Sequence, residues 1–255
     1  MPFSAQNTDN MNNFSRTDLA AELIKAKGRD FDGVCKVSVV DLDSARAAAY
    51  GKSEGRYVTL ETDAITGYSP RDKTRLARVL AGQLAALLPS RKNLLVVGLG
   101  NANMTADALG AEVCRDIFVE SGRVRTLCPG VAGNTGIESY DIVKGVADRI
   151  KPSAVIAVDS LAAASTARVC RVIQLCDAGI TPGSGVSNHR ERLSERTLGV
   201  PVVAIGVPLV VYASTIIRDA GGDEEGFESL IVTPKDIDLL VREAAAVVCR
   251  AINML

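Results

Sequence analysis

The chain has 255 residues, of which 47% are hydrophobic and 23% charged, an ordinary composition for a soluble globular protein. Its formal net charge of −1 argues against general binding to a nucleic-acid backbone, and an aromatic content of 4% without Trp argues against stacking on single strands. No apolar run approaches the ~18 residues of a membrane span. The N-terminus lacks the basic start and apolar stretch of a secretory signal. We therefore expect a cytoplasmic protein that binds neither nucleic acid nor membranes.

The cysteines and the single histidine give no metal-binding pattern. Six cysteines are scattered along the chain without a C-x-x-C pair, and His189 is the only histidine. A zinc site needs closely paired Cys and His ligands, so we predict no metal and no cofactor. In a chain without a leader, the simplest expectation is that the cysteines are reduced, buried thiols. They are Cys35, Cys114, Cys128, Cys170, Cys176 and Cys249.

The first half of the chain opens with a polar, Asn-rich stretch over residues 1–18, which we expect to be a mobile tail and a possible prosegment. Ser69-Pro70 is typical of a helix start, because a capping side chain precedes Pro in the first turn, and Pro89 ends the apolar stripe that follows. The other expected elements are a helix over 16–26 capped by Thr17 or Asp18, strands over 34–42, 56–61 and 94–99, and a helix over about 105–120.

The second half continues this alternation. Its expected strands cover 124–127, 154–158, 169–175 and 201–207, and its first helices cover about 140–150 and 210–219. A glycine-rich loop over 129–139 precedes the first of these helices, and an acidic loop covers 220–229. Thr233-Pro234 is expected to cap a final helix with an apolar face between Ile237 and Ile252.

Strands that alternate with helices through the middle of the chain predict a three-layer α/β/α sandwich with a mostly parallel sheet. The early pair of strands is expected to form a small antiparallel annex. No internal repeat or second domain is evident, so residues 19–255 are predicted to form a single domain.

Two apolar strands lead to an aspartate. The run 94–99 is followed by a glycine turn and then by Asp107, and the run 154–158 is followed directly by Asp159. Open α/β sheets place ligands and chemistry at the carboxyl ends of parallel strands, so we expect both carboxylates at one edge. Two carboxylates in one site do not both ionise readily. One then keeps a proton while the other acts as a base toward water, which suits amide hydrolysis without a metal.

The turn between the first strand and Asp107 contains Asn101, Asn103 and Thr105. These side chains are candidates to orient the carboxylates or to stabilise an oxyanion. A purely structural interpretation is also available. An aspartate is favoured in the first turn of a helix, which fits Asp107, and at the start of a loop, which fits Asp159. Spacing alone leaves both interpretations open.

Two glycine-rich segments raise the question of nucleotide or anion binding. The GLG turn at 98–100 is half of a dinucleotide fingerprint, but Asn103 stands where its third glycine belongs. The loop 177–190 contains PGSG, whose backbone N–H groups around Gly183 and Ser184 are candidates for binding an anion or a substrate. The alternative is a turn-rich surface loop.

The chain contains, in this order, the motifs RTDLA, EGRYVTLE, VVGLGNANMTADALG, PGVAGNTGIES, DIVKGV, KPSAVIAVDSLA, GITPGSGVSN, TLGVPVVAIGVP and VTPKDIDLLV. These motifs resemble, in the same order, those of the germination proteases of spore-forming bacteria. The resemblance covers roughly residues 15–253. Enzymes of this family degrade small acid-soluble spore proteins when germination begins, so the resemblance implies these proteins as the substrate.

The resemblance also implies an atypical aspartic endopeptidase, made as a zymogen in the forespore and activated by removal of a short N-terminal prosegment. It implies a homotetramer in the spore core, with a fold similar to the hydrogenase-maturation peptidases. The two proposed catalytic aspartates of the family fall on Asp107 and Asp159, the pair chosen from the strand ends. Ala106 and Ala111 stand where the family usually has prolines, and Tyr212 stands where it has an aspartate.

Two alternatives remain open at this point. One is a maturation-type peptidase of the same fold that clips another partner with the help of a bound metal, which a single histidine supports weakly. The other is a non-catalytic relative that binds a peptide or small anion through the 177–190 loop. Loss of Asp107 would leave the function of that relative unchanged.

Overall fold

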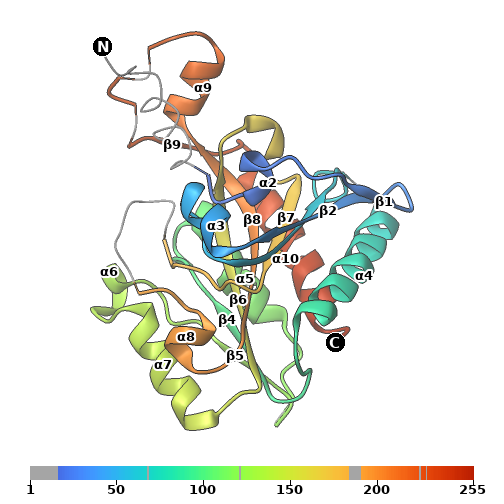
Figure 1. The fold of residues 1–255 in the computed structure, drawn as a ribbon, viewed down its shortest axis with the longest axis vertical. Helices are drawn as coiled ribbons and strands as arrows, with labels where there is room; N and C mark the ends of the chain where they lie inside the picture. Colours follow the sequence, from blue (N-terminus) through green and yellow to red (C-terminus); the bar gives the residue numbers. More distant parts are fainter. Residues whose placement is uncertain (1–16, 68, 121, 184–190, 224, 228) are drawn as a thin grey trace.

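A computed structural model describes residues 17–67, 69–120, 122–183, 191–223, 225–227 and 229–255. In this part of the chain, a nine-stranded sheet has the order β1-β2-β3-β7-β8-β6-β4-β5, with β9 paired to β8 (Figure 1). The strands are β1 Arg29–Phe31, β2 Cys35–Leu42, β3 Gly55–Glu61, β4 Leu94–Gly98, β5 Val124–Leu127, β6 Ala154–Ala163, β7 Val172–Cys176, β8 Val202–Tyr212 and β9 Ile231–Val232.

The sheet is more mixed than the sequence predicts. Strands β5, β4, β6 and β8 pair in parallel, whereas β7, β3, β2 and β1 extend the sheet with antiparallel pairs. The expected early annex is therefore not separate, because β3 pairs with β7 and joins the first strands to the main sheet. Each parallel pair is joined by a connection that contains a helix, because parallel strands need a long crossover.

Helices cover both faces of the sheet, which confirms the three-layer α/β/α class. One buried cluster joins α4 Pro70–Leu87, α5 Leu109–Asp116 and α10 Ile237–Ile252 to one face, and a second joins α2 Ala20–Leu23, α3 Ser44–Ala49, α7 Ser139–Ile150 and α8 Glu195–Leu198 to the other. Two further helices are α6 Ala132–Thr135 and α9 Ala213–Asp219, and two short 3-10 helices are η2 Thr105–Asp107 and η3 Thr166–Arg168.

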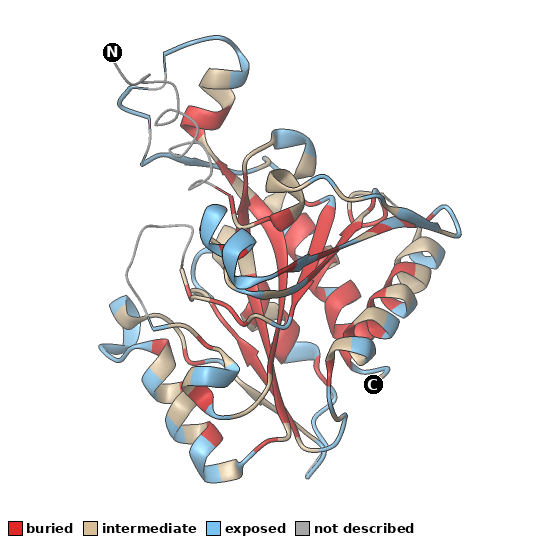
Figure 2. Cartoon of the chain, viewed as in Figure 1, coloured by how far each residue is buried: buried red, intermediate tan, exposed pale blue. Residues whose placement is uncertain are grey.

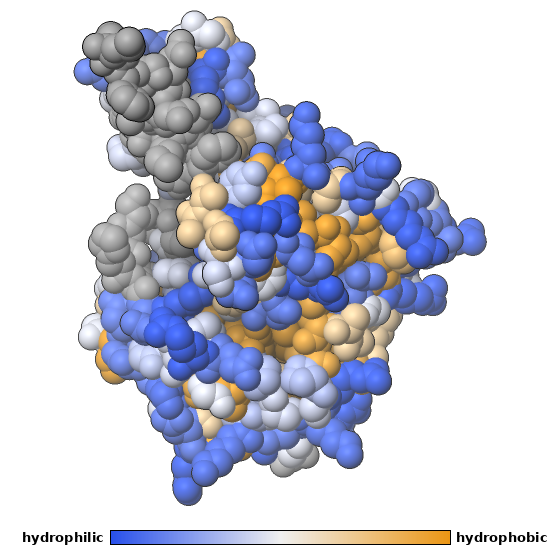
Figure 3. Space-filling view, in the orientation of Figure 1, coloured by the Kyte–Doolittle hydropathy of each residue, from blue (hydrophilic) through white to orange (hydrophobic). Residues whose placement is uncertain are grey.

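Alternate residues of the central strands belong to opposite clusters. In β4, Leu94 and Val96 lie in the first cluster, and Leu95 and Val97 lie in the second. Burial of both faces explains why these strands read as continuous apolar runs in the sequence. Figure 2 shows the buried residues concentrated along the sheet. In Figure 3 the surface is largely hydrophilic at its rim, with apolar side chains visible in its middle.

Helix α4 begins as its sequence predicts. The Ser69 hydroxyl accepts a hydrogen bond from the backbone N–H of Asp72 at 3.2 Å, and Pro70 occupies the first helical position. Proline is tolerated there because its missing N–H would have had no partner inside the helix. The helix ends at Leu87, just before Pro89.

The N-terminal segment differs from its prediction. The expected helix over 16–26 is reduced to α2, whose N-cap is Leu19 without a side-chain cap. Thr17 and Asp18, which we assigned to the tail, are tied to the body of the protein. The backbone N–H of Asp18 donates to the carbonyl of Ala162 in β6 at 3.0 Å. Residues 1–16 lie outside the described residues.

Four other elements also differ from their predictions. Strand β6 continues to Ala163, so Asp159 lies within the strand and not after it. The helix expected from residue 105 is divided into η2 and α5, and the strand β8 runs on to Tyr212. Helix α10 begins at Ile237, because the Thr233 hydroxyl donates to the carbonyl of Leu209 at 2.9 Å and does not cap the helix.

No helix in the described part of the chain is long and apolar enough to cross a membrane.

Candidate active site

The candidate site lies where β4 ends, beside Asp159 in the middle of β6. Strands β4 and β6 are paired in register from Leu94 with Ala154 to Gly98 with Val158. The pairing continues one step further, because the N–H of Leu99 donates to the carbonyl of Val158 at 2.8 Å. The loop that follows β4 therefore passes next to Asp159.

Asp107 is held by the loop that carries it. Its Oδ2 accepts a hydrogen bond from the backbone N–H of Asn101 at 2.8 Å, and its own N–H donates to the carbonyl of Met104 at 2.7 Å. Gly100 makes this closed loop possible. A Cβ at this position would lie 2.1 Å from the carbonyl oxygen of Asp107, and the φ of +92° disfavours other residues. The glycine turn thus positions the carboxylate.

Asp159 is buried, with 5% of its surface exposed. Burial raises the pKa of its carboxyl well above the usual value of 3.8, and the nearby carboxylates of Asp107 and, less strongly, Asp18 raise it further. Hydrogen bonds from the backbone of Ser160, at 2.9 Å to Oδ1, and from the backbone of Gly183 act in the opposite direction. Desolvation and a second negative charge both disfavour the ionised form, so Asp159 favours its protonated form.

Helix α5 packs unusually close to both strands. A Cβ on Gly110 would lie 2.4 Å from the backbone N and O of Leu99 and 2.6 Å from the carbonyl oxygen of Val158. Only a glycine allows this approach, because the neighbouring atoms belong to the backbone and have little freedom to move. The contact fixes the start of α5, and with it the loop of Asp107, against the strand that carries Asp159.

The supporting residues predicted from the sequence, Asn101, Asn103 and Thr105, lie on the loop that carries Asp107 but differ in their contacts. Asn101 contacts Asp107 through its backbone, while its side-chain Oδ1 accepts from the N–H of Asn103 and from Nδ2 of Asn134, both at 3.0 Å. Asn103 and Thr105 are exposed on the same loop. Asn101 therefore shapes the loop instead of presenting its amide to Asp107.

The 177–190 loop is described only in part. The backbone of Gly183 hydrogen-bonds to Asp159, which brings the first part of this loop to the candidate site. Ser184, the other residue predicted there, lies outside the described residues. The described residues also contain no group of three His, Cys, Asp or Glu side chains that could hold a metal ion.

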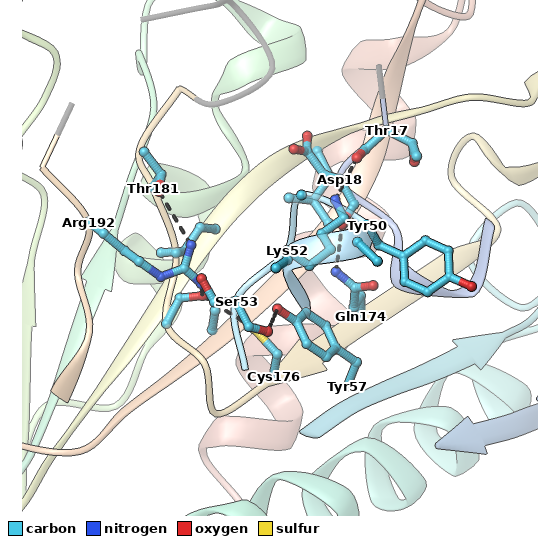
Figure 4. A pocket seen from close by; sticks show the side chains of 18 residues that line it. Thr17, Asp18, Tyr50, Lys52, Ser53, Tyr57, Gln174, Cys176, Thr181 and Arg192 are labelled. Atoms are coloured by element: carbon cyan, nitrogen blue, oxygen red, sulfur yellow. Dashed lines mark hydrogen bonds between the residues drawn. The ribbon is translucent and has the colours of Figure 1, made fainter. Parts of the chain in front are cut away.

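A pocket of about 500 Å³ lies beside the site, and it was not predicted from the sequence (Figure 4). Its lining includes Leu161 and Gly206. Gly206 in β8 is the residue that pairs with Asp159 in β6. Side chains at alternate positions of a strand share a face, so Asp159 and Leu161 lie on the same side of β6. The pocket therefore lies on the same side of β6 as the buried carboxyl group, and neither Asp107 nor Asp159 is among its lining residues.

Two cationic side chains line this pocket. Lys52 Nζ donates to the carbonyl of Thr17 at 2.6 Å, and burial lowers the pKa of Lys52, although Asp18 acts in the opposite direction. Arg192 donates to the carbonyls of Ala178 at 3.0 Å and Gly179 at 2.7 Å. In Figure 4, Lys52 and Arg192 come from different segments of the chain. The local sequence around Lys52 carries no motif that identifies it, because the pocket forms only when these distant segments meet.

Together, the fold and the two acidic side chains define an α/β protein with a carboxyl pair at the carboxyl edge of its parallel strands. Residues 4–222 match the family described as germination protease. A germination protease of Clostridium perfringens is 35% identical, over 94% of both chains, and one of Caldanaerobacter subterraneus is 36% identical, over 94% of this chain and 93% of the relative. One of Bacillus subtilis is 42% identical, over 80% of this chain and 65% of the relative.

The chain therefore belongs to the germination protease family, and it is a member of a family of peptidases. Among solved structures, a [NiFe] hydrogenase maturation protease, HycI, of Thermococcus kodakarensis is similar, with a TM-score of 0.44 and 19% identity. The similarity covers 67% of this chain and 98% of that one.

Proposed function

We propose that this protein is an endopeptidase that begins the degradation of small acid-soluble spore proteins during germination, with Asp107 and Asp159 activating water. The observation that carries the mechanism is the burial of Asp159 near a second carboxylate, because this raises the pKa of one acid of the pair. The substrate follows from membership of the germination protease family and from the resemblance of the motifs.

The two carboxyl groups have different environments, and this difference supports different roles for them in the proposed mechanism. Asp159 is buried and keeps its proton, whereas Asp107 is half-buried on a loop and accepts a backbone N–H. In the proposed reaction, the Asp107 carboxylate takes a proton from water as the water oxygen attacks the peptide carbonyl carbon. Asp159 donates a hydrogen bond or its proton to the carbonyl oxygen, which stabilises the tetrahedral intermediate.

The intermediate then collapses as the C–N bond breaks. The proton that Asp107 accepted passes to the leaving amine, and the proton on the intermediate's oxygen returns to Asp159. The pair thus ends in its starting protonation state. The pocket lined by Lys52 and Arg192 lies on the same side of β6 as Asp159, and we propose that it receives a side chain of the substrate.

The remaining features of the proposal are the zymogen, the homotetramer and the spore-core location, which rest on the resemblance to the family. Activation by removal of an N-terminal segment is compatible with the contacts of Thr17 and Asp18, since cleavage before Thr17 would preserve them. A monomeric mass for the native protein in solution would remove the homotetramer from the proposal.

The first experiment is cleavage of a purified small acid-soluble spore protein by the full chain and by a chain that starts at Thr17. Asp107→Asn is the test variant, and Asp116→Asn, an exposed aspartate at the end of α5, is the matched control. We expect the shortened chain and its control variant to cleave with and without a chelator, and Asp107→Asn to lose about 10²–10⁴-fold in kcat/KM.

The other outcomes discriminate between the alternatives. Cleavage that a chelator abolishes would favour a metal-assisted maturation-type peptidase. Absence of cleavage in every form, combined with binding of the spore protein, would favour a binding-only relative. Near-normal cleavage by Asp107→Asn would refute the catalytic role of that residue.

A further inference from the structure

Two loops meet at the candidate site. One is the Asp107 loop, residues 99–108, between β4 and α5, and the other is the β5–α7 loop, residues 128–138. The base of the β5–α7 loop is fixed, because Ser139, which is buried at the start of α7, donates through its hydroxyl to the carbonyl of Gly130 at 2.8 Å. The middle of this loop is the single helical turn α6. The β5–α7 loop is thus anchored to α7 at one end and free to contact the Asp107 loop with its helical turn.

Asn134, in α6, makes that contact. Its Nδ2 donates to Oδ1 of Asn101 at 3.0 Å, and the same Oδ1 accepts the backbone N–H of Asn103 at 3.0 Å. The partners of a side-chain amide decide which of its ends is the oxygen. Because a backbone N–H only donates, the end of the Asn101 amide that faces Asn103 is the oxygen. Asn134 is therefore the donor and Asn101 the acceptor.

The backbone of Asn101 is engaged as well. Its N–H donates to Oδ2 of Asp107 at 2.8 Å, and its carbonyl accepts the N–H of Met104 at 3.0 Å. Of the four hydrogen bonds named for Asn101, only the one from Asn134 comes from outside the Asp107 loop. Asn134 therefore connects the residue that holds the Asp107 carboxylate to a separately anchored part of the protein.

We propose that Asn134 is a positioning residue for the peptidase: by holding the amide of Asn101, it keeps the Asp107 carboxylate in the orientation that lets it take a proton from water. The inference rests on the proposed function, because it assumes that Asp107 is the base. A shift of about 1 Å at a reacting group costs up to about 10²-fold in rate. One hydrogen bond between side chains that are not buried contributes little to the stability of the fold, so its loss should affect the rate of reaction more than folding.

The first test compares two variants of Asn134 on cleavage of a small acid-soluble spore protein by the chain that starts at Thr17. Asn134→Asp keeps the shape of the side chain but donates no hydrogen bond, and Asn134→Ala removes the group without adding a charge. We expect each to lower kcat about tenfold and to change KM less than about twofold. Gln83→Glu in α4 is the matched control, because it makes the same exchange of amide for carboxylate away from both loops.

A double-mutant cycle tests whether Asn134 acts through Asn101. Asn101→Ala retains the backbone N–H toward Asp107 but removes the oxygen that accepts from Asn134. In this background, Asn134→Ala should lower kcat less than about twofold further. A general disturbance of the β5–α7 loop would instead lower kcat by the same factor in both backgrounds, because independent effects are additive in free energy.

Amide hydrogen exchange followed by NMR measures the positioning without catalysis. The N–H of Asn101 should exchange about tenfold faster in both Asn134 variants than in wild type or Gln83→Glu, while the amides of β4 keep their wild-type rates. Unchanged kcat in the Asn134 variants, equal losses in the two backgrounds of the cycle, or unchanged exchange at Asn101 would each overturn the proposal. If the wild-type chain cleaves no spore protein, the proposed function fails, while the exchange rates still decide whether Asn134 holds the Asp107 loop.

Discussion

At the scale of single residues, the central fact is the placement of a carboxyl group inside the protein. Asp159 lies in the middle of β6, between residues of the apolar core, and hydrogen bonds from Ser160 and Gly183 compensate only part of the cost of burial. An acid in such a position holds its proton more tightly in the folded chain than in the unfolded chain. Its folded-state pKa therefore affects stability as well as reactivity.

The pH dependence of stability follows from this difference. Between the unfolded-state pKa of about 3.9 and the higher folded-state pKa, only the folded chain retains the proton. The contribution of this proton to the free energy of unfolding is fully present below the unfolded-state pKa. It is lost at about 1.4 kcal/mol per pH unit as the pH rises from the unfolded-state pKa to the folded-state pKa.

We therefore expect Asp159→Asn to be more stable than wild type at neutral pH and to lack this component of the pH dependence. Urea unfolding followed by circular dichroism between about pH 4 and pH 8 measures both free energies. Asp116→Asn, an exposed acid, serves as the control and should follow wild type. A constant difference between wild type and Asp159→Asn across this range would contradict the raised pKa.

At the scale of elements, close backbone packing positions the site. The start of α5 touches the end of β4 and the middle of β6 through Gly110, where no side chain fits, and the turn at Gly100 closes on Asp107. These two glycines bring the loop of one acid to the strand of the other. Capping side chains act more locally, because they set where a helix begins and not which strands it meets.

Gly110→Ala is expected to lower the free energy of unfolding by about 2 kcal/mol or more, because its new methyl group would overlap with backbone atoms of Leu99 and Val158. Gly145→Ala in α7 is the matched control, since a Cβ there meets nothing within 4 Å. The control should be neutral or more stable by up to about 1 kcal/mol, as alanine favours a helix. Urea midpoints provide the measurement, and equal effects of the two variants would refute the packing argument.

Ser69→Ala removes the N-cap of α4 and is expected to cost about 1 kcal/mol. The cause is the loss of the hydrogen bond to the N–H of Asp72, which then has no partner within the helix. Chemical denaturation measures the loss. Ser69→Asp should recover most of it, because aspartate also caps a helix. An alanine variant as stable as wild type would show that the cap contributes nothing.

At the scale of the whole molecule, the N-terminal segment is held by strands β6 and β7, which are distant from it in the sequence. The Gln174 side chain in β7 accepts from the N–H of Ala20 at 2.7 Å and donates to the carbonyl of Asp18 at 3.0 Å. Asp18 and Glu22 accept hydrogen bonds from the N–H groups of Ala162 and Ala164, both at 2.8 Å. These bonds place the segment beside the strand that carries Asp159.

We predict that Gln174→Ala destabilises the protein by about 1–3 kcal/mol, because it leaves two backbone groups of the N-terminal segment without their buried partner. Limited proteolysis should then cut near Ala20 faster than in wild type, and mass spectrometry of the fragments identifies the position. Gln83→Ala, on the partly exposed side of α4, is the control and should leave the cleavage rate unchanged. An unchanged rate for Gln174→Ala would show that this anchor is unimportant.

The sequence by itself determined the elements whose cause is local. The Ser69-Pro70 start of α4, the apolar strands β4 and β6 and the α/β class follow from caps, turn residues and the period of apolar side chains. The proximity of Asp107 and Asp159 was also predictable, because parallel strands bring their carboxyl ends to one edge. The catalytic roles of the two acids remain predictions.

Only the tertiary structure decided the features that depend on contacts between distant segments. It extended β6 past Asp159 and buried that acid, and it joined the early strands to the main sheet through β7. It also formed the pocket beside the site from segments far apart in the chain. The burial and pKa of Asp159 and the shape of the pocket depend on how many distant residues pack together. A local sequence pattern reflects only the conformational preferences of residues that are neighbours in the chain.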